Sequence, residues 1–170
     1  LLATEVFKVA ANGAYFLFLK ANGTLYGAGR DSSGQLGRNQ YPFPAIAEIA
    51  TDVVDMQAGS GFSVYLKSNG ELWGSGLNTS GQLGDGSTVS RYMFSLITTG
   101  VKRVSTSGSH VLFIKTDDTL WGMGNNTSGA LGDGTFTNRS SPIQIASNVV
   151  ECTAGGSYSL YITSDGALWG

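Results

Sequence analysis

"LWGMGNNTSGALGDGT", residues 120–135, begins with two residues that favour β-strands and continues almost entirely in glycine, asparagine, serine and threonine. Nothing in it has the pattern of a nucleophile, a metal cage or a phosphate-binding loop. Closely related segments stand at residues 25–39, "LYGAGRDSSGQLGRN", and 72–87, "LWGSGLNTSGQLGDGS". A segment that returns at a fixed spacing indicates a repeat architecture, so we interpret it as part of a structural unit.

The sequence around each copy predicts four short strands. An apolar pair such as Val101 and Val104 marks the first strand, and an apolar run such as "VLFI", residues 111–114, forms the second. The turns "ANGT", "SNGE", "TDDT" and "SDGA" lead to a third strand that ends at an aromatic residue, since Asn-Gly and Asp-Gly favour hairpins. The fourth strand is expected in "FPAIAEI", "MFSLIT" and "SPIQI", residues 43–49, 93–98 and 141–145.

Four short strands in a unit of about 48 residues are typical of one blade of a β-propeller. We therefore predict an all-β protein with four-stranded blades, forming a single partial propeller over residues 1–170. Three repeats are complete and a fourth is not. The approximate repeat boundaries are 5–51, 52–99, 100–147 and 148–170.

Two recurring positions are expected to fill the seams between blades. The first is a large aromatic ring that covers much apolar area with little rotamer entropy. The second is the leucine of the glycine-rich loop, expected to plug that loop into an apolar slot. The predicted seam residues are Tyr26, Trp73, Trp121 and Trp169, together with Leu36, Leu83 and Leu131.

Composition excludes several classes of function. Charged residues make up 13% of the chain, the net charge is −2, and no strongly basic cluster is present, so we expect no nucleic-acid binding. With one cysteine and one histidine, we expect no metal site and no cofactor. The acidic residues are scattered singly, which argues against a pair of catalytic carboxylates. No apolar run is long enough to predict membrane insertion.

The repeat resembles that of the regulator of chromosome condensation family. The resemblance is carried by "VVECTAGGSYSLYITSDGALWG", residues 149–170, and by "LNTSGQLGDGST", residues 77–88, and it extends over essentially the whole chain. The extension at residues 132–139 is similar to bacterial and phage varieties of the repeat. The histidine of the family motif is present only as His110, and the other copies carry Tyr15, Phe62 and Tyr158.

The resemblance implies a seven-bladed ring, which would need roughly 340 residues. This chain would then be a fragment of a longer protein, or two copies would close one ring by dimerisation; we favour the fragment. The resemblance also implies action through protein contacts on a propeller face, because members serve as a nucleotide exchange factor for a small GTPase, as a β-lactamase inhibitor and as a light-sensing dimer.

Two sets of residues are candidates for binding a partner. Tyr15, Phe62, His110 and Tyr158 form a recurring aromatic position that either caps the core of each blade or makes a patch for a partner. Between the repeats, the loops differ most at Arg30-Asp31, Leu77-Asn78 and Asn125-Asn126, where a uniform frame would carry specificity. From these pairs we choose Arg30, Leu77 and Asn125.

We therefore expect a rigid, non-enzymatic module for protein interaction or structure, with an unidentified protein, or a glycan, as its partner. Low charge and abundant small polar residues favour a larger extracellular, cell-surface or virion-associated protein. One alternative is an intracellular regulator that binds a GTPase or another protein. The other is a carbohydrate-active or other propeller enzyme.

Overall fold

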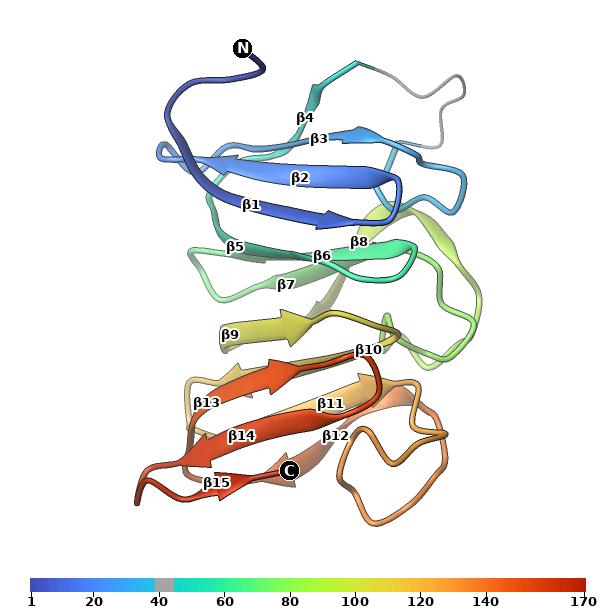
Figure 1. Cartoon of the computed structure of the whole chain (residues 1–170), viewed down its shortest axis with the longest axis vertical. Helices are drawn as coiled ribbons and strands as arrows, with labels where there is room; N and C mark the ends of the chain where they lie inside the picture. The colour runs from blue at the N-terminus through green and yellow to red at the C-terminus, as the bar shows by residue number, and fades with distance from the viewer. Residues whose placement is uncertain (39–44) are drawn as a thin grey trace.

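The computed structural model describes residues 1–38 and 45–170, and within them every strand pairs antiparallel with its neighbours and no helix occurs. Four sheets, which we call blades 1–4, stand side by side with the N-terminus at one end and the C-terminus near the other (Figure 1). The strands are β1 (Val6–Asn12), β2 (Tyr15–Lys20), β3 (Leu25–Gly29), β4 (Ala47–Ala50), β5 (Val53–Ala58), β6 (Phe62–Lys67), β7 (Leu72–Gly76), β8 (Arg91–Thr98), β9 (Val101–Thr106), β10 (His110–Lys115), β11 (Leu120–Gly124), β12 (Arg139–Ala146), β13 (Val149–Ala154), β14 (Ser159–Thr163) and β15 (Leu168–Trp169).

Blades 1, 2 and 3 have four strands in sequence order, and blade 4 has the three strands β13, β14 and β15. The all-β partial propeller predicted from the repeat is thus confirmed. The predicted fourth strands are offset from the observed ones: β8 and β12 begin two residues earlier than expected, and in the first repeat the observed strand is β4, Ala47–Ala50. Residues 43 and 44 of "FPAIAEI" lie outside the described residues.

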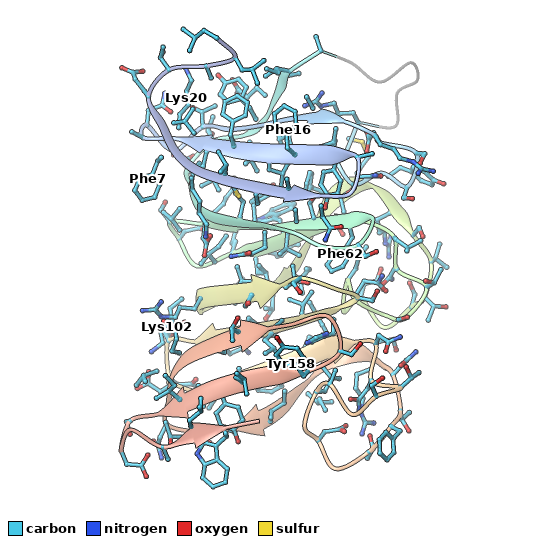
Figure 2. All side chains as sticks on the ribbon, in the orientation of Figure 1. Phe7, Phe16, Lys20, Phe62, Lys102 and Tyr158 are labelled. Carbon is cyan, nitrogen blue, oxygen red and sulfur yellow. The ribbon has the colours of Figure 1, made fainter. Side chains whose placement is uncertain are left out.

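The innermost strands β1, β5, β9 and β13 all carry the same irregularity. In each, the pairing register shifts by one residue, so that one extra residue forms a bulge against the second strand. The bulged residues are equivalent in the four repeats, and Phe7 and Lys102 lie at the same edge of the molecule (Figure 2). They are Phe7, Val54, Lys102 and Val150.

The second strands of blades 2 and 3, β6 and β10, pack against a neighbouring blade on both faces. In β6, Phe62, Val64 and Leu66 join the core shared with blade 3, and Tyr65 joins the core shared with blade 1. A strand that is covered on both faces needs continuous apolar sequence, which explains the runs "SVYL" and "VLFI". Three such cores, one per seam, hold the four blades together.

Candidate interaction face

The turns after β1, β5, β9 and β13 and the long loops after β3, β7 and β11 come together at one end of the blades, which we call the loop face. Their common position follows from the pairing of Tyr15 with Gly29 and of Gly76 with Arg91. The first loop residue is anchored there, because its backbone N–H donates a hydrogen bond to the carbonyl of the inner turn. The three bonds are Arg30 to Ala14 (2.9 Å), Leu77 to Gly61 (2.8 Å) and Asn125 to Ser109 (2.9 Å).

Of the variable pairs singled out from the sequence, only the first residue faces outward. Arg30 is exposed, and Leu77 and Asn125 are partly exposed. The second residues, Asp31, Asn78 and Asn126, are buried, so they are not exposed to a partner.

The buried asparagines hold the loops closed. The Asn126 Oδ1 accepts a hydrogen bond from the backbone N–H of Leu131 (2.9 Å), and its Nδ2 donates to Asp133 Oδ1 (2.9 Å) and to the carbonyl of Thr135 (3.0 Å). Asn78 repeats this arrangement with Leu83 and Asp85. Each amide therefore joins the start of its loop to the Asp-Gly turn seven residues later.

The loop of blade 1 is held closed by a different pair of residues: a carboxylate at its start and a guanidinium seven residues later. Asp31 accepts hydrogen bonds from the backbone N–H groups of Leu36 (2.7 Å) and Arg38 (3.2 Å). The Arg38 guanidinium donates to the carbonyls of Gly27 (2.8 Å) and Ala47 (2.7 Å). Arg38 is thus part of the frame of the loop, at the position where the other repeats have Asp85 and Asp133.

The carboxylates of Asp85 and Asp133 are fixed by ion pairs. Arg139 Nη2 lies 2.6 Å from Asp133 Oδ2, and Arg91 Nη2 lies 2.5 Å from Asp85 Oδ2. Burial raises the pKa of both carboxyls, but hydrogen bonds from hydroxyl, backbone and guanidinium groups outweigh it and lower each pKa to about 2. Both residues are therefore anions that stabilise loops. The described residues contain no cluster of three or more His, Cys, Asp or Glu side chains suited to a metal ion.

The recurring aromatic position is mostly internal. Tyr15, Phe62 and His110 are buried, and Phe62 lies within the stack of blades (Figure 2). The Tyr15 hydroxyl reaches blade 2, 2.9 Å from the carbonyl of Gly59, and burial raises its pKa to about 12. These three side chains do not form an exposed aromatic patch, because the following blade covers each of them. Tyr158, which no blade covers here, is 61% exposed.

The residues predicted to fill the seams lie at the blade interfaces, except Tyr26. Leu36, Leu83 and Leu131 are buried, each in the core after its own blade. Trp73 and Trp121 pack against the core before their own blades, and each stacks on the facing ring of the second strand. Tyr26 stacks on Phe18 in the same way, but blade 1 has no blade before it.

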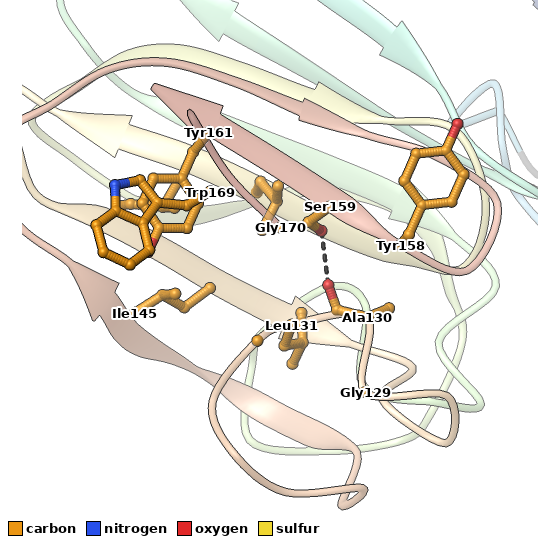
Figure 3. Close-up of a pocket in the computed structure, with 12 residues that line it drawn as sticks. Gly129, Ala130, Leu131, Ile145, Tyr158, Ser159, Tyr161, Trp169 and Gly170 are labelled. Carbon is orange, nitrogen blue, oxygen red and sulfur yellow. Dashed lines mark hydrogen bonds between the residues drawn. The ribbon is translucent and has the colours of Figure 1, made fainter. Parts of the chain in front are cut away.

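Trp169 differs from its counterparts because it is 53% exposed. It stacks on Tyr161 and borders a cavity of about 250 Å³ between blades 3 and 4, together with Leu131 and Ile145 (Figure 3). The Ser159 hydroxyl donates to the carbonyl of Ala130 (2.6 Å) across this seam.

Two exposed apolar residues of the loops were not predicted as binding residues from the sequence. Val89, between β7 and β8, is 68% exposed, and Phe136, between β11 and β12, is 73% exposed. The available signal was an apolar residue in a loop that is otherwise polar. Exposed apolar and aromatic side chains are common in protein interfaces, so both belong to the candidate face.

Comparison with known proteins identifies the repeat. Models of the regulator of chromosome condensation (RCC1) repeat match residues 53–82, 101–130 and 117–162, which together make up more than half of the chain. No curated protein sequence matches the chain.

Solved structures share the fold. Human WBSCR16 is similar with a TM-score of 0.86 and 24% identity over 97% of this chain and 47% of that one. Yeast RCC1 (Prp20), crystallised with Kap60, is similar with a TM-score of 0.78 and 18% identity over 96% of this chain and 42% of that one. A structure of Prp20p from Saccharomyces cerevisiae, whose description names binding to Gsp1p and histones, is similar with a TM-score of 0.76 and 18% identity over 96% of this chain and 44% of that one.

This chain spans less than half the length of each of these structures. The repeat matches, the four antiparallel blades and the shared fold lead to one conclusion. The chain belongs to the regulator of chromosome condensation (RCC1) repeat family.

Proposed function

We propose that this chain is a non-enzymatic protein-interaction module that binds a protein partner through its loop face. One observation carries the proposal. In each loop, a buried frame residue directly follows an outward residue whose chemistry changes from blade to blade. The outward residues are a cation, an aliphatic side chain and an amide: Arg30, Leu77 and Asn125.

A constant frame with changing outward residues is how a rigid scaffold presents a binding surface. The backbone anchors of 2.8–2.9 Å hold the three positions in equivalent places on successive blades. Val89 and Phe136 add exposed apolar area from the same loops, which suits a protein surface with complementary pockets.

The state of the loop carboxylates supports a non-enzymatic role. With the pKa of Asp85 and of Asp133 lowered to about 2, neither carboxyl holds a proton near neutral pH. A general acid in glycoside hydrolysis needs a raised pKa and a second carboxylate nearby. The carbohydrate-active alternative therefore lacks support from these two residues.

We further propose that the module is part of a larger surface-exposed or virion-associated protein, which the low charge and the small polar residues support. An intracellular GTPase regulator is the second candidate. Its support is the shared fold with Prp20p, whose described binding properties include Gsp1p.

Site-specific photo-crosslinking tests the loop face directly. A photoreactive residue is placed at Phe136 in the loop face, or at Ser68, an exposed residue in the β6–β7 turn at the other end of blade 2. We expect one protein of the native source to be captured from position 136 and not from position 68. Capture should be lost on Leu77→Asp, with the thermal unfolding curve unchanged.

The same assay decides between the candidates. Equal capture from positions 136 and 68, or capture that survives Leu77→Asp and Arg30→Glu, would contradict a loop-face site. A captured small GTPase would favour the regulator, and a captured envelope or receptor protein would favour the surface-exposed module. Arg38→Glu is not a suitable variant, because Arg38 holds the loop frame.

A further inference from the structure

A hollow of about 270 Å³ opens on the loop face between blades 1 and 2. The β1–β2 turn and the β5–β6 turn border it, and these turns lie next to each other at one end of the stack (Figure 1). The first loop residue of each blade also lines it, Arg30 from blade 1 and Leu77 from blade 2. Both walls of the hollow therefore belong to two blades of this chain that pack against each other.

The wall that blade 1 contributes contains a buried amide. Gln35 lines the hollow and is 3% exposed. Its Oε1 accepts a hydrogen bond from the backbone N–H of Ser33 (3.0 Å), and because a backbone N–H can only donate, this contact fixes which end of the amide is the oxygen. The nitrogen Nε2 is left for the hollow, and it has no hydrogen-bond partner within residues 1–38 and 45–170. A ligand atom that accepts a hydrogen bond would satisfy this buried donor.

The charge and the hydroxyls of the hollow favour an anion. No acidic side chain lines it, and Arg30, whose Nε donates to Ser32 Oγ (2.7 Å), forms no ion pair with any described residue. The adjacent carboxylate of Asp31 accepts hydrogen bonds inside its own loop and does not line the hollow. The hydroxyls of Ser33 and Ser60 add two further groups that can donate to an anion.

The equivalent place between blades 2 and 3 differs in two ways. Asn125 stands where blade 2 has Leu77, and its Nδ2 lies 3.5 Å from Ser80 Oγ of the preceding blade. Gln82 stands where blade 1 has Gln35, and it is fully buried. The aliphatic Leu77 has no polar group that could reach back in this manner, so the amide of blade 1 keeps its access to the hollow.

The size of the hollow limits what it can bind. Sites for small molecules and cofactors usually have about 300–1,000 Å³, so this hollow is better suited to one side chain of a protein partner. Leu77 offers apolar contact to methylene groups, whereas Arg30 and Gln35 offer donors to a carboxylate. Hydrogen bonds between a guanidinium and a carboxylate are charge-assisted and about twice as strong as neutral ones. Glutamate combines methylene groups with a carboxylate.

We propose that this hollow binds a glutamate side chain of the protein partner. The carboxylate accepts hydrogen bonds from Gln35 Nε2 and from the Arg30 guanidinium, and the methylene groups pack on Leu77. This inference rests on the proposed function of the loop face and names the chemistry of one contact within it. The seam between blades 1 and 2 thereby selects an acidic segment of the partner.

Two probes of nearly equal shape test the site, namely the α-amide of N-acetylglutamate and that of N-acetylglutamine. Each is titrated across a millimolar range into the isotope-labelled chain at constant ionic strength, and the side-chain amide resonances are followed by heteronuclear NMR. We expect the Gln35 amide to shift saturably with the glutamate probe and not with the neutral one. The Gln82 amide is the internal control, because it is equivalent in the repeat and fully buried.

Variants that copy other repeats keep the fold while changing the hollow. Gln35→Ala copies Ala130, and Leu77→Asn copies Asn125. Followed at the backbone amide of Ser33, Gln35→Ala should weaken binding of the glutamate probe roughly tenfold or more, the usual effect of losing a hydrogen bond to a charged group. Leu77→Asn should also weaken it, because the new amide can reach Ser33 and close the hollow. Asn125→Leu, the reverse exchange in the next seam, is the matched control and should not change it.

Three results would overturn the proposal: equal shifts with the two probes, no saturable shift with the glutamate probe, or tighter binding of inorganic phosphate at the same resonances. Photo-crosslinking from position 136 separates this proposal from the proposed function. Partner capture that is as strong in Gln35→Ala as in the native chain would contradict the glutamate contact and leave the loop-face function standing. No capture from position 136, with a shift specific to the glutamate probe, would contradict the loop-face function and support the carboxylate site.

Discussion

The imidazole of His110 crosses from blade 3 to blade 4, where its Nε2 lies 3.0 Å from the hydroxyl oxygen of Ser159. Because that hydroxyl donates its own proton to the carbonyl of Ala130, the Nε2–H is the donor in this contact. Burial removes the imidazole from water and so lowers the pKa of His110. The folded protein therefore holds a neutral histidine inside a seam.

This contact predicts a pH dependence of stability near pH 6. The unfolded chain protonates His110 at an ordinary pKa of about 6.5. Since the folded pKa is lower, the unfolded state takes up a proton that the folded state refuses, and stability falls as the pH drops below about 6.5. Denaturant unfolding at pH 7 and pH 5 should show this loss in the native chain and a smaller one in His110→Phe.

The double variant His110→Phe/Ser159→Val provides the control for that experiment. It copies the apolar contact between Phe62 and Val111 in the preceding seam. We expect it to be more stable than His110→Phe alone and to show the same reduced pH dependence as that single variant. Equal pH slopes in the native chain and in His110→Phe would show that His110, the single histidine, titrates alike in both states.

The repeat spacing was sufficient to predict the blades but not which loop residues are buried. Strand positions follow from recurring apolar and glycine residues, which occupy the same structural positions in every repeat. Arg30-Asp31, Leu77-Asn78 and Asn125-Asn126 all read as polar or variable pairs, and the burial of the second residue depends on a turn seven residues away. That contact is set by how the loop folds back, which local pattern does not reveal.

The recurring aromatic position shows a second property that could not be predicted from the sequence, namely the exposure of each side chain. Tyr15, Phe62, His110 and Tyr158 are equivalent in the repeat, yet three are buried and one is exposed. Their exposure is decided by whether a following blade covers them. Periodicity identifies equivalent residues, whereas burial at the ends depends on the neighbours of each blade.

The buried amide of Asn126 should be essential for its loop. Asn126→Asp replaces the Nδ2 donor with a second carboxylate oxygen 2.9 Å from Asp133, so it removes the hydrogen bonds that Nδ2 donates to Asp133 and Thr135 and adds repulsion. We expect a loss of about 1–3 kcal/mol in the free energy of unfolding. Asn125→Asp, one residue earlier and outward, should change it by less than about 0.5 kcal/mol. Similar losses in both variants would argue against the frame role of Asn126.

Acid should release the loop carboxylates. The folded pKa of Asp133 is about 2, against an unfolded value of about 3.9, so its stabilising effect is present above pH 4 and is lost as the pH falls toward 2. Asp133→Asn should therefore lower the melting temperature at pH 7 and flatten its decline between pH 4 and pH 2. The exposed Glu48→Gln is the matched control, and a decline as flat as that of Asp133→Asn in this variant would refute the assignment.

The close approach between the second and third strands predicts a large difference between two glycines. Gly124 and Gly134 both adopt positive φ, 103° and 74°, so alanine at either position costs about 1–2 kcal/mol in backbone strain. At Gly134 an added Cβ meets nothing within 4 Å. At Gly124 it would lie 2.6 Å from the carbonyl oxygen of Ser109 and 2.8 Å from the Cα of His110.

Because both neighbours of Gly124 are backbone atoms, they cannot rotate away. Gly124→Ala should lose a further 1–3 kcal/mol or so relative to Gly134→Ala, measured by denaturant unfolding. The same carbonyl of Ser109 anchors the N–H of Asn125, so the clash should also move the loop face, visible as amide chemical-shift changes in the β11–β12 loop. Equal losses in the two variants would mean that the strands separate freely, and a rigid frame for the loop face would then have no physical basis.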